Sequence, residues 1–420
     1  MNEKLFIMIL NSCFTSVVKV FTLILVVCLI SFSCKVSKTG NDTASYWVGT
    51  WGTAPQLVET RNMPPEPGLS ENSLRQIVRV SLGGTTLRVK FTNEFSADPV
   101  TMKSVQIAAS TGGHSIDVST NKELKFNGNS EITMNPGEAV ISDPITFDLT
   151  PRMDVAITIY YGQTSETVSG HPGSRTTSFL LPGNVTSNTD FSEAIEVERW
   201  YNINRIDVMA NHPAASVAIF GNSITDGRGS ITDQQNRWPD VLSERLLQNP
   251  ATQHIGVLNM GIGGNAVLAG GLGPTGMSRY ERDILNQPGV RWAIIFHGVN
   301  DIGSVTSAEA ATKRTEDLIA AYKQMITQAR EKNIKVYGGT IVPFKGNSYY
   351  NEFSEQSRIA VNEWIRTSGW FDAVIEFEKA LSSPDDLASQ VSTYQNDGLH
   401  PDAAGYKTMG ELVDLNLFID

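Results

Sequence analysis

From residue 213 to the C-terminus, short apolar runs alternate with amphipathic stretches, and this alternation limits the possible folds more than any other feature of the chain. The apolar runs are SVAIF, IGVLNM, WAIIFHG, IKVYGGT and FDAVIEF. Helical periodicity predicts helices in RWPDVLSERLLQ and SRYERDIL and across residues 307–332, 355–367 and 402–417. Short buried strands that alternate with helices pack as a mostly parallel sheet with helices on both faces. Residues 213–420 are therefore predicted to form an α/β domain.

Polar and glycine-rich segments follow several of these strands. Open α/β sheets carry their functional groups at the carboxyl ends of the strands, so these loops are where chemistry is expected. Four segments stand out: Gly221-Asn222-Ser223, the glycine-rich loop 259–265, Gly298-Val299-Asn300-Asp301, and Asp397-Gly398-Leu399-His400-Pro401 near the C-terminus. Together they supply a hydroxyl, a glycine amide, a carboxamide, an imidazole and a carboxylate.

Acyl transfer requires this set of groups. A serine hydroxyl such as that of Ser223 is a weak nucleophile until a neutral histidine, here His400, takes its proton. Asp397 can bind the other ring nitrogen, fix the tautomer and stabilise the imidazolium. The backbone N–H groups of Ser223 and Gly264 and the side-chain amide of Asn300 are suited to an oxyanion hole.

Other motifs in the chain are weaker candidates for chemistry. His297 is a rival base, but its place at a strand end favours a packed histidine near the site. His171 is expected in a surface loop of the N-terminal half; the alternative is that it reaches the site from there. The segment 271–276 matches G-x-G-x-x-G, but Pro274 disrupts the helix that such a motif should open, so no dinucleotide cofactor is predicted. The histidine spacing predicts no metal, and no G-x-S-x-G elbow is present.

The N-terminal half has the two-residue period of β-strands. Residues 47–200 are predicted to form an all-β sandwich, because alternating apolar runs are separated by Asn, Pro and Gly clusters and no long helical stretch intervenes. The runs QIVRVSL and LRVKF flank Gly83-Gly84, which predicts a hairpin.

Residues 1–34 have the character of an export signal. The run VFTLILVVCLISFS, residues 20–33, is short for a membrane span but suits a signal sequence. The small residues before Cys34 are similar to a bacterial lipobox, which would make Cys34 a lipidated first residue. A cleaved signal without a lipid and a single anchor helix are the alternatives. Residues 35–46 are small and polar and are predicted to be a tether. The expected location is the cell envelope, as a lipoprotein, or a secreted or periplasmic state.

Charge and cysteine content exclude several classes of function. The formal net charge is −11, and no basic stripe with interleaved aromatic residues is present, so a nucleic-acid partner is not expected. The three cysteines, Cys13, Cys28 and Cys34, all lie in the first 34 residues. The remainder of the chain therefore holds no catalytic thiol, zinc-cysteine cluster or disulfide.

The four segments resemble the conserved blocks of the SGNH hydrolases, also called GDSL esterases. Longer stretches, WVGTWGTAPQ, SLRQIVRVSLGG, RWPDVL, YERDIL, GGTIVPF and LHPDAAGY, are similar to a two-domain secreted subfamily related to acetylxylan esterases. The resemblance implies a β-sandwich followed by a flavodoxin-like three-layer α/β/α domain. It assigns the serine, glycine, asparagine and histidine blocks to Ser223, Gly264, Asn300 and His400, with Asp397 as the triad acid. Asn222 departs from the usual aspartate; it keeps an acceptor for local turn hydrogen bonds but loses the charge.

The resemblance and the export signal together predict an esterase that removes short acyl groups, acetate above all, from polysaccharides or oligosaccharides through an acyl-serine. A lysophospholipase or thioesterase of the same fold is one alternative. A non-catalytic carbohydrate-binding lipoprotein is another. No cofactor is expected, and contact with a membrane is expected only through the N-terminal anchor.

Overall fold

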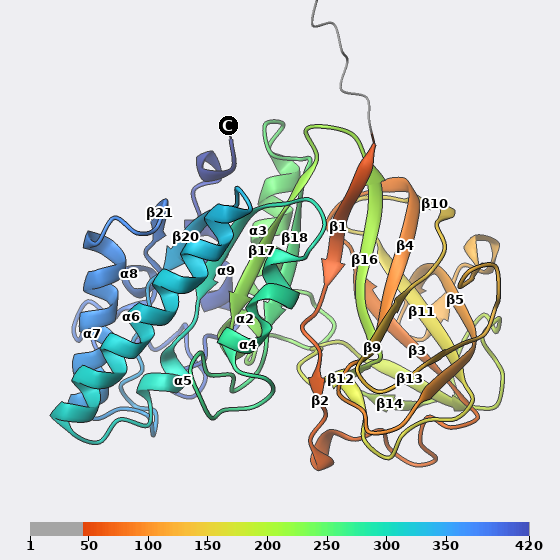
Figure 1. The fold of residues 1–420 in the computed structure, drawn as a ribbon, viewed down its shortest axis with the longest axis horizontal. Coiled ribbons are helices and arrows are strands. Elements are labelled where there is room, and N and C mark those ends of the chain that lie inside the picture. Colours follow the sequence, from red (N-terminus) through yellow and green to blue (C-terminus); the bar gives the residue numbers. More distant parts are fainter. Residues whose placement is uncertain (1–44, 420) are drawn as a thin grey trace, which may run out of the picture. The chain divides into compact units, whose positions relative to one another are not determined.

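Five parallel strands form the centre of the C-terminal half of the computed structural model (Figure 1). Their order in the sheet is β18-β17-β19-β20-β21. The strands are β17 (Ala215–Gly221), β18 (Ile255–Gly261), β19 (Val290–Phe296), β20 (Lys335–Gly339) and β21 (Ala373–Ile375). Every residue of β17 is buried, as expected for a strand whose two faces are both covered. The predicted parallel sheet is confirmed.

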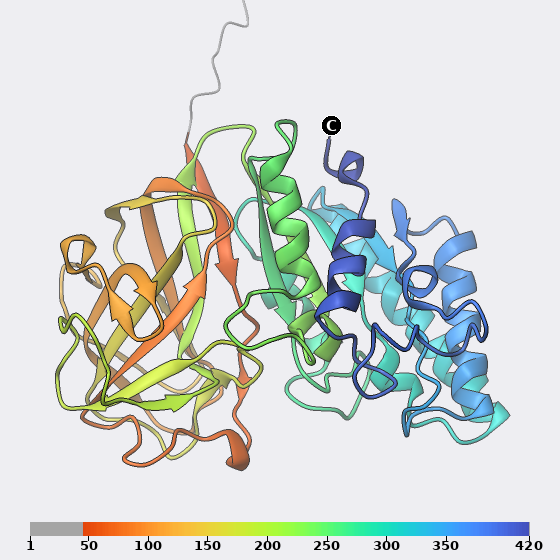
Figure 2. The ribbon, with the colours of Figure 1, turned by 180° about the vertical axis from the view of Figure 1, so that it is seen from behind.

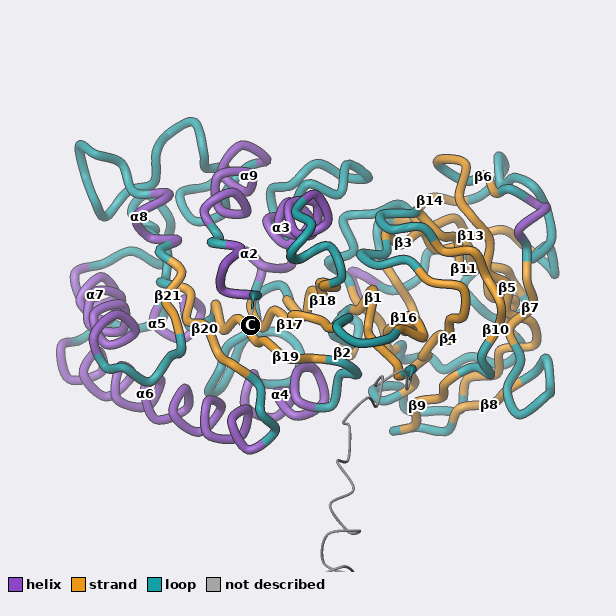
Figure 3. Tube along the Cα trace, turned by 90° about the horizontal axis from the view of Figure 1, so that it is seen from above, coloured by secondary structure: helices purple, strands orange, loops and turns teal. Residues whose placement is uncertain are grey.

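Helices cover both faces of this sheet (Figure 3). One face carries α3 (Trp238–Gln248), α8 (Phe377–Leu381) and α9 (Ala403–Leu412), and the other carries α4 (Gly276–Tyr280), α6 (Ala308–Glu331) and α7 (Glu352–Thr367). Figure 2 shows α3 and α9 side by side on the face that is turned away in Figure 1. The expected helix 402–417 is shorter than predicted, because Val413 is extended and Asp414 caps a separate 3-10 turn, η4 (Leu415–Phe418).

Two antiparallel sheets make up most of the N-terminal half. The first contains β1 (Tyr46–Gly52), β16 (Ile203–Ala210), β4 (Gly84–Asn93), β10 (Ile145–Leu149) and β9 (Glu138–Ile141). The second contains β14 (Ile195–Val197), β13 (Ser178–Pro182), β3 (Asn72–Arg79), β11 (Asp154–Tyr161), β5 (Val100–Gly112), β6 (Ser115–Ile116), β7 (Lys122–Leu124) and β8 (Ile132–Met134). A small third sheet contains β15 (Trp200–Tyr201), β12 (Ser169–His171) and β2 (Gln56–Leu57). Buried side chains of both large sheets share one hydrophobic core. We call residues 46–210 the β-region.

The hairpin predicted around Gly83-Gly84 is wrong. Strand β3 pairs with β11 and β13, whereas β4 pairs with β10, β16 and β9, so the two strands belong to different sheets. The turn carries the chain across the core from one sheet to the other. Alternation of apolar residues indicates which side of a strand is buried but not which strand lies beside it, so a hairpin and a crossing between sheets look alike in sequence.

The β-region packs directly on the parallel sheet, and strand β1 lies beside β18 (Figure 1). The Ser216 hydroxyl of β17 donates to the Gly49 carbonyl of β1 at 2.7 Å, and the Gly49 N–H donates to the Pro288 carbonyl at 3.0 Å. The β-region also continues beyond residue 200, since β16 runs to Ala210 between β1 and β4.

The structure describes residues 45–419. The predicted signal, Cys34 and almost all of the tether lie outside them, while Tyr46, the last residue assigned to the tether, begins β1. None of the helices in the described part is long and apolar enough to cross a membrane.

Candidate active site

Ser223 lies at the point where β17 ends and the short helix α2 (Ser223–Asp226) begins. Asn222 caps this helix, because its side-chain oxygen accepts a hydrogen bond from the Ile224 N–H at 3.1 Å. Asn222 therefore accepts the local turn hydrogen bond that the sequence predicted, although it lacks the charge of an aspartate. α2 lies at the carboxyl edge of the sheet, the lower edge in Figure 1, together with α5 (Val299–Ile302).

Ser223, His400 and Asp397 form a continuous hydrogen-bonded chain. The Ser223 Oγ lies 2.8 Å from His400 Nε2, and His400 Nδ1 lies 2.8 Å from Asp397 Oδ2. The His400 N–H also donates to Asp397 Oδ1 at 2.9 Å, which fixes the carboxylate relative to the ring. Because a carboxylate can only accept, Nδ1 carries the proton and Nε2 is left to accept from the serine hydroxyl.

The charges and burial of His400 and Asp397 suit His400 to act as a base at neutral pH. Burial lowers the pKa of His400, and the neighbouring Asp397 offsets only part of this effect, so the ring is neutral near pH 7. Partial burial by itself raises the pKa of Asp397, but hydrogen bonds from the His400 backbone and ring outweigh burial and hold the pKa below its ordinary value. Asp397 is therefore ionised over the range in which His400 titrates.

Gly264 and Asn300 lie on the same cavity as Ser223. Gly264 has a φ of +67°, a conformation that side chains rarely adopt. The Asn300 amide is held on both sides: its Nδ2 donates to the Asn265 carbonyl at 2.7 Å, and its Oδ1 accepts from the Tyr349 hydroxyl at 3.1 Å. An amide nitrogen has two hydrogens, so one donor of Asn300 remains for a ligand.

Asp301 joins two loops of the site, a role that the sequence did not reveal. Its carboxylate accepts from the backbone N–H groups of Val267 and Leu268, each at 2.9 Å. Burial raises the pKa of Asp301, although these two hydrogen bonds oppose the rise. The contacts fix the loop that contains Gly264 relative to α5, which carries Asn300.

A buried guanidinium ties the ends of two central strands together. Arg279 donates to the Gly221 carbonyl of β17 and to the Met260 carbonyl of β18, each at 2.8 Å, and pairs with Asp283 at 3.0 Å. Burial lowers the pKa of Arg279 to about 10, against the opposing effect of Asp283, so it stays charged at neutral pH. An arginine in a helical pattern gives no sign in the sequence that it is buried, which is why its role was missed.

His297, the rival base, is a packed histidine as predicted. Its side chain is buried, and its Nε2 lies 3.1 Å from Asn265 Oδ1. Its Nδ1 accepts from the Gly298 N–H at 2.9 Å, so both ring nitrogens are occupied. Burial, reinforced by the charge of Arg279, holds the pKa of His297 well below its ordinary value.

His171 is not in a surface loop, and that expectation is wrong. It is the last residue of β12 and is only 4% exposed, because it stacks on Trp200 inside the β-region. Its Nε2 lies 2.9 Å from Oδ1 of Asp226, the last residue of α2, and its Nδ1 lies 2.9 Å from the Ala54 carbonyl. The β-region therefore contacts the helix that begins with Ser223.

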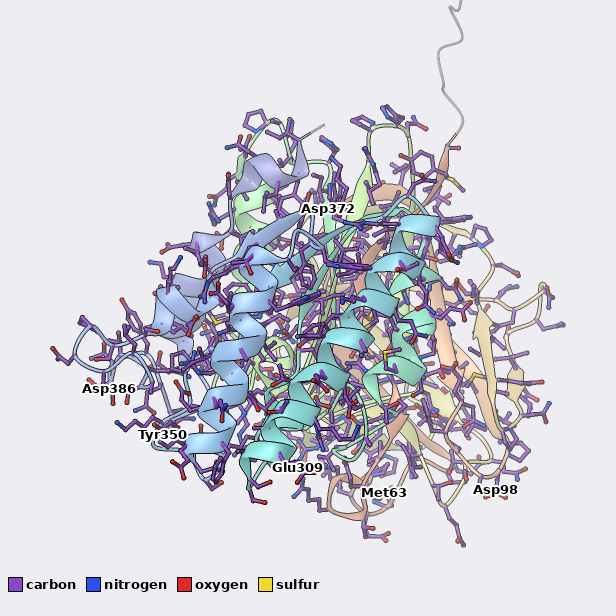
Figure 4. The ribbon with its side chains drawn as sticks, turned by 60° about the vertical axis from the view of Figure 1, so that its left-hand side comes forward. Met63, Asp98, Glu309, Tyr350, Asp372 and Asp386 are labelled. Carbon is purple, nitrogen blue, oxygen red and sulfur yellow. The ribbon has the colours of Figure 1, made fainter. Side chains whose placement is uncertain are left out.

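Ser223 and His400 open onto a cavity of about 460 Å³ with one wall from the β-region. The lining is mostly polar: Gln56, Glu59, Arg61, Asn62, Pro172, Gly173, Arg175 and Arg199 from the β-region, with Ser223, Asp226, Arg228, Gly263, Gly264, Leu272, Asn300, Tyr349, Leu399 and His400. Figure 4 shows Met63 and Tyr350, which follow the lining residues Asn62 and Tyr349 in the chain, in the lower part of the molecule, and Asp372 in its upper part. Leu272 belongs to the glycine-rich segment 271–276, which thus borders the site. Within residues 45–419, no three histidine, cysteine, aspartate or glutamate side chains are grouped as a metal would require.

Comparison with known proteins gives one family. Residues 219–408 match the family described as GDSL-like Lipase/Acylhydrolase, as the sequence resemblance predicted. None of the curated proteins matches the chain.

Three solved structures are similar to part of the chain. A lipolytic protein of the G-D-S-L family from Desulfitobacterium hafniense DCB-2 is 22% identical, over 47% of this chain and 97% of that one, with a TM-score of 0.36. The acetyl xylan esterase AlAXEase is 22% identical, over 47% and 96%, with a TM-score of 0.36. A lipolytic G-D-S-L family member from Veillonella parvula DSM 2008 is 21% identical, over 47% and 96%, with a TM-score of 0.35.

Proposed function

We propose that this carboxylic ester hydrolase, whose residues 219–408 belong to the GDSL-like Lipase/Acylhydrolase family, is a serine esterase that works through an acyl-serine intermediate. The observation that carries the proposal is the chain from the Ser223 hydroxyl through His400 to Asp397, with 2.8 Å at each of its two links. Such a chain activates a serine towards acyl groups, since the base, its orienting carboxylate and the nucleophile are all within hydrogen-bond reach.

In the first half of the reaction, Ser223 Oγ attacks the ester carbonyl carbon while His400 Nε2 takes its proton. The resulting oxyanion accepts hydrogen bonds from the backbone N–H groups of Ser223 and Gly264 and from the free Nδ2 hydrogen of Asn300. Asp397 stabilises the imidazolium. When the intermediate collapses, the bond to the alcohol breaks and His400 returns the proton to the departing oxygen.

In the second half, water attacks the acyl-serine. His400 accepts one proton of the water as the new carbon–oxygen bond forms, and the same donors stabilise the second oxyanion. Collapse releases the carboxylic acid and returns the proton from His400 to Ser223 Oγ. The catalytic residues are thus restored without any cofactor taking part.

We assign residues 213–420 to the flavodoxin-like three-layer α/β/α class and residues 47–200 to a β-sandwich. The strand order β18-β17-β19-β20-β21 supports the first assignment, because it is the 2-1-3-4-5 order of that class. The shared core of two antiparallel sheets supports the second.

The substrates that we propose are short acyl esters, acetate above all, of polysaccharides or oligosaccharides. The cavity supports this class, since half of its lining residues are arginines, amides and carboxylates and few are apolar. A saccharide presents hydroxyl groups to such a surface, whereas a long acyl chain needs apolar walls. Export of the protein, with Cys34 as its lipidated anchor, is a further proposal that rests on the sequence of residues 1–34.

The first test is hydrolysis of p-nitrophenyl acetate by the full-length protein and its Ser223→Ala variant. We expect turnover that disappears in Ser223→Ala and persists in Ser119→Ala, a control in an exposed turn of the β-region. Trapping of an acetyl group on Ser223 after rapid quenching tests the intermediate. A series of acyl lengths separates a deacetylase from a lysophospholipase or thioesterase. Glycan binding without turnover of any ester by the unmutated protein would favour the non-catalytic alternative.

A further inference from the structure

The cavity beside Ser223 has the opposite charge to the protein as a whole. The chain carries 44 acidic and 33 basic residues, for a formal net charge of −11. The cavity lining, however, contains four arginines, Arg61, Arg175, Arg199 and Arg228, which we call the arginine cluster, and only two carboxylates, Glu59 and Asp226. Arginine is always protonated in proteins, so the lining has a formal excess of positive charge.

Two members of the arginine cluster have no carboxylate to balance them. Arg199 donates to the side-chain oxygen of Asn62 at 2.7 Å and to the Glu198 carbonyl at 2.6 Å, both of which are neutral acceptors. Arg61 is exposed and makes no hydrogen bond or ion pair with any residue between 45 and 419. Both side chains belong to the β-region wall, so their charges are available to a ligand.

The carboxylates near the other two arginines are only loosely paired with them. Arg175 Nη2 lies 3.8 Å from Asp226 Oδ2, and Arg228 Nε lies 3.8 Å from Asp397 Oδ2. Both distances are beyond that of a direct hydrogen bond. Glu59 is already occupied, since it accepts from the amides of Gln56 and Asn62 at 2.8 Å each.

Unsatisfied buried atoms at the same wall point independently to a ligand. The Asp226 side chain is 2% exposed, yet its Oδ2 has no hydrogen-bond partner, and the same is true of the buried Arg175 Nε. A buried polar atom without a partner is costly, so an unfilled acceptor and an unfilled donor on one cavity wall indicate a bound group that supplies both. A saccharide with hydroxyl groups and an oxyanion has these two features.

We propose that this cavity recognises an oxyanion group, the carboxylate of a uronic acid or a sulfate, on the saccharide that bears the ester. The planar fork of each guanidinium matches the two oxygens of such a group. The inference rests on the proposed esterase function, and it narrows the substrate class from saccharide esters in general to esters of acidic saccharides.

The test compares three acetylated sugars that differ at one carbon, using the full-length protein. They are mono-O-acetylated methyl glucoside, the matching methyl glucuronide with a carboxylate at C6, and the matching glucoside 6-sulfate. We expect kcat/KM to be at least about tenfold higher for an anionic sugar than for the neutral glucoside, because a hydrogen bond between charged groups has an effect of about this size. The preference should shrink as salt is added, because an exposed guanidinium is screened. Preference for the glucuronide alone identifies a carboxylate site, and equal preference for the sulfate identifies a general oxyanion site.

Variants test whether the arginine cluster is the cause. Arg61→Gln should reduce the ratio of anionic to neutral kcat/KM about threefold or more, and Arg61→Glu should reduce it further. Arg61 has no partner in the described part of the chain, so these variants should fold normally. Lys313→Gln is the matched control, since that exposed lysine pairs only with Asp317 on its own helix and should leave the ratio unchanged.

Different results would overturn the oxyanion site and the esterase function. Equal rates on the neutral and anionic sugars, with turnover that still requires Ser223, would overturn the oxyanion site and leave the esterase intact. An unchanged ratio in Arg61→Glu would also overturn it. The oxyanion site would also be overturned if the protein hydrolysed p-nitrophenyl acetate but none of the three sugars. Loss of the esterase itself would be seen in p-nitrophenyl acetate hydrolysis, which needs no anionic group.

Discussion

Replacing Gly173 by alanine should disturb α2, the helix that begins with Ser223, from the β-region side. An ideal Cβ at residue 173 would lie 2.0 Å from Oδ2 and 2.4 Å from Oδ1 of Asp226. Carbon and oxygen atoms that are not bonded need about 3.5 Å, so one of the two residues must move. Asp226 is poorly able to move, because it is buried and its Oδ1 is held by His171 Nε2 at 2.9 Å.

The expected loss of stability follows from these contacts. Overpacking of a filled site costs about 1–3 kcal/mol. If the His171–Asp226 hydrogen bond also breaks, the buried carboxylate loses its partner at a further cost of about 1–3 kcal/mol. We therefore expect Gly173→Ala to lower the free energy of unfolding by about 2–6 kcal/mol in urea titrations. The kcat/KM for p-nitrophenyl acetate should fall about tenfold or more, since Ser223 and Asp226 share one helical turn and small displacements of a nucleophile are costly.

Two further variants make this reasoning refutable. At Gly263, an ideal Cβ would lie 3.3 Å from the same Asp226 Oδ2, so Gly263→Ala should be clearly milder than Gly173→Ala in unfolding free energy. The double variant Gly173→Ala, Asp226→Ala should lose less stability than the sum of the two single variants, because the clash has gone. Strict additivity, or equal effects at the two glycines, would refute the clash with Asp226 as the cause.

Three other predictions concern the reaction and its scaffold. Asn300→Ala should lower kcat about a hundredfold or more in protein that is still folded, and unchanged turnover would remove Asn300 from the mechanism. The kcat/KM should be constant at high pH and fall as the pH drops through the pKa of His400, because only the neutral ring accepts the serine proton. The midpoint should lie below 6.5, and a midpoint above 6.5 would contradict the effect of burial on His400. Arg279→Met should lower the free energy of unfolding by about 3–5 kcal/mol, because it removes one partner of a buried ion pair and two strand-end hydrogen bonds. A loss below about 1 kcal/mol, which is the cost of losing an exposed ion pair, would argue against a role of Arg279 in holding the strand ends.

The parallel sheet and its helices were predictable because their signals are local. The period of the apolar residues indicates helix or strand directly, so the stretch predicted across 307–332 is found as α6, Ala308–Glu331. The positions of Ser223 and Asn300 also followed from a local rule, since each was expected just after a strand, at the carboxyl edge of the sheet, where the structure has α2 and α5. Their proximity then follows from the topology. The His400 segment was found by its motif rather than by its place after a strand.

Features that depend on contacts between distant segments were not predictable. The pairing of β3 and β4 with different sheets depends on which strands surround them, and alternation is the same in either case. His171 lies in a stretch rich in Gly, Pro and Ser, which favours a surface loop, yet it is buried against Trp200 and Asp226. The sequence contains no sign of the contact between His171 and Asp226, because these two residues are separated by 55 positions along the chain.

The shortness of α2, the helix that begins with Ser223, explains why contacts from several directions are needed to hold it. α2 contains only four residues, and a helix of that length has almost no stability of its own. Asn222 caps it from within, Arg279 holds the carbonyl of Gly221 just before it, and His171 holds Asp226 at its end. The third of these supports comes from the β-region. The geometry of Ser223 therefore depends on the packing of the β-region against the sheet, so we expect a substitution in that contact to reduce turnover without touching Ser223, His400 or Asp397.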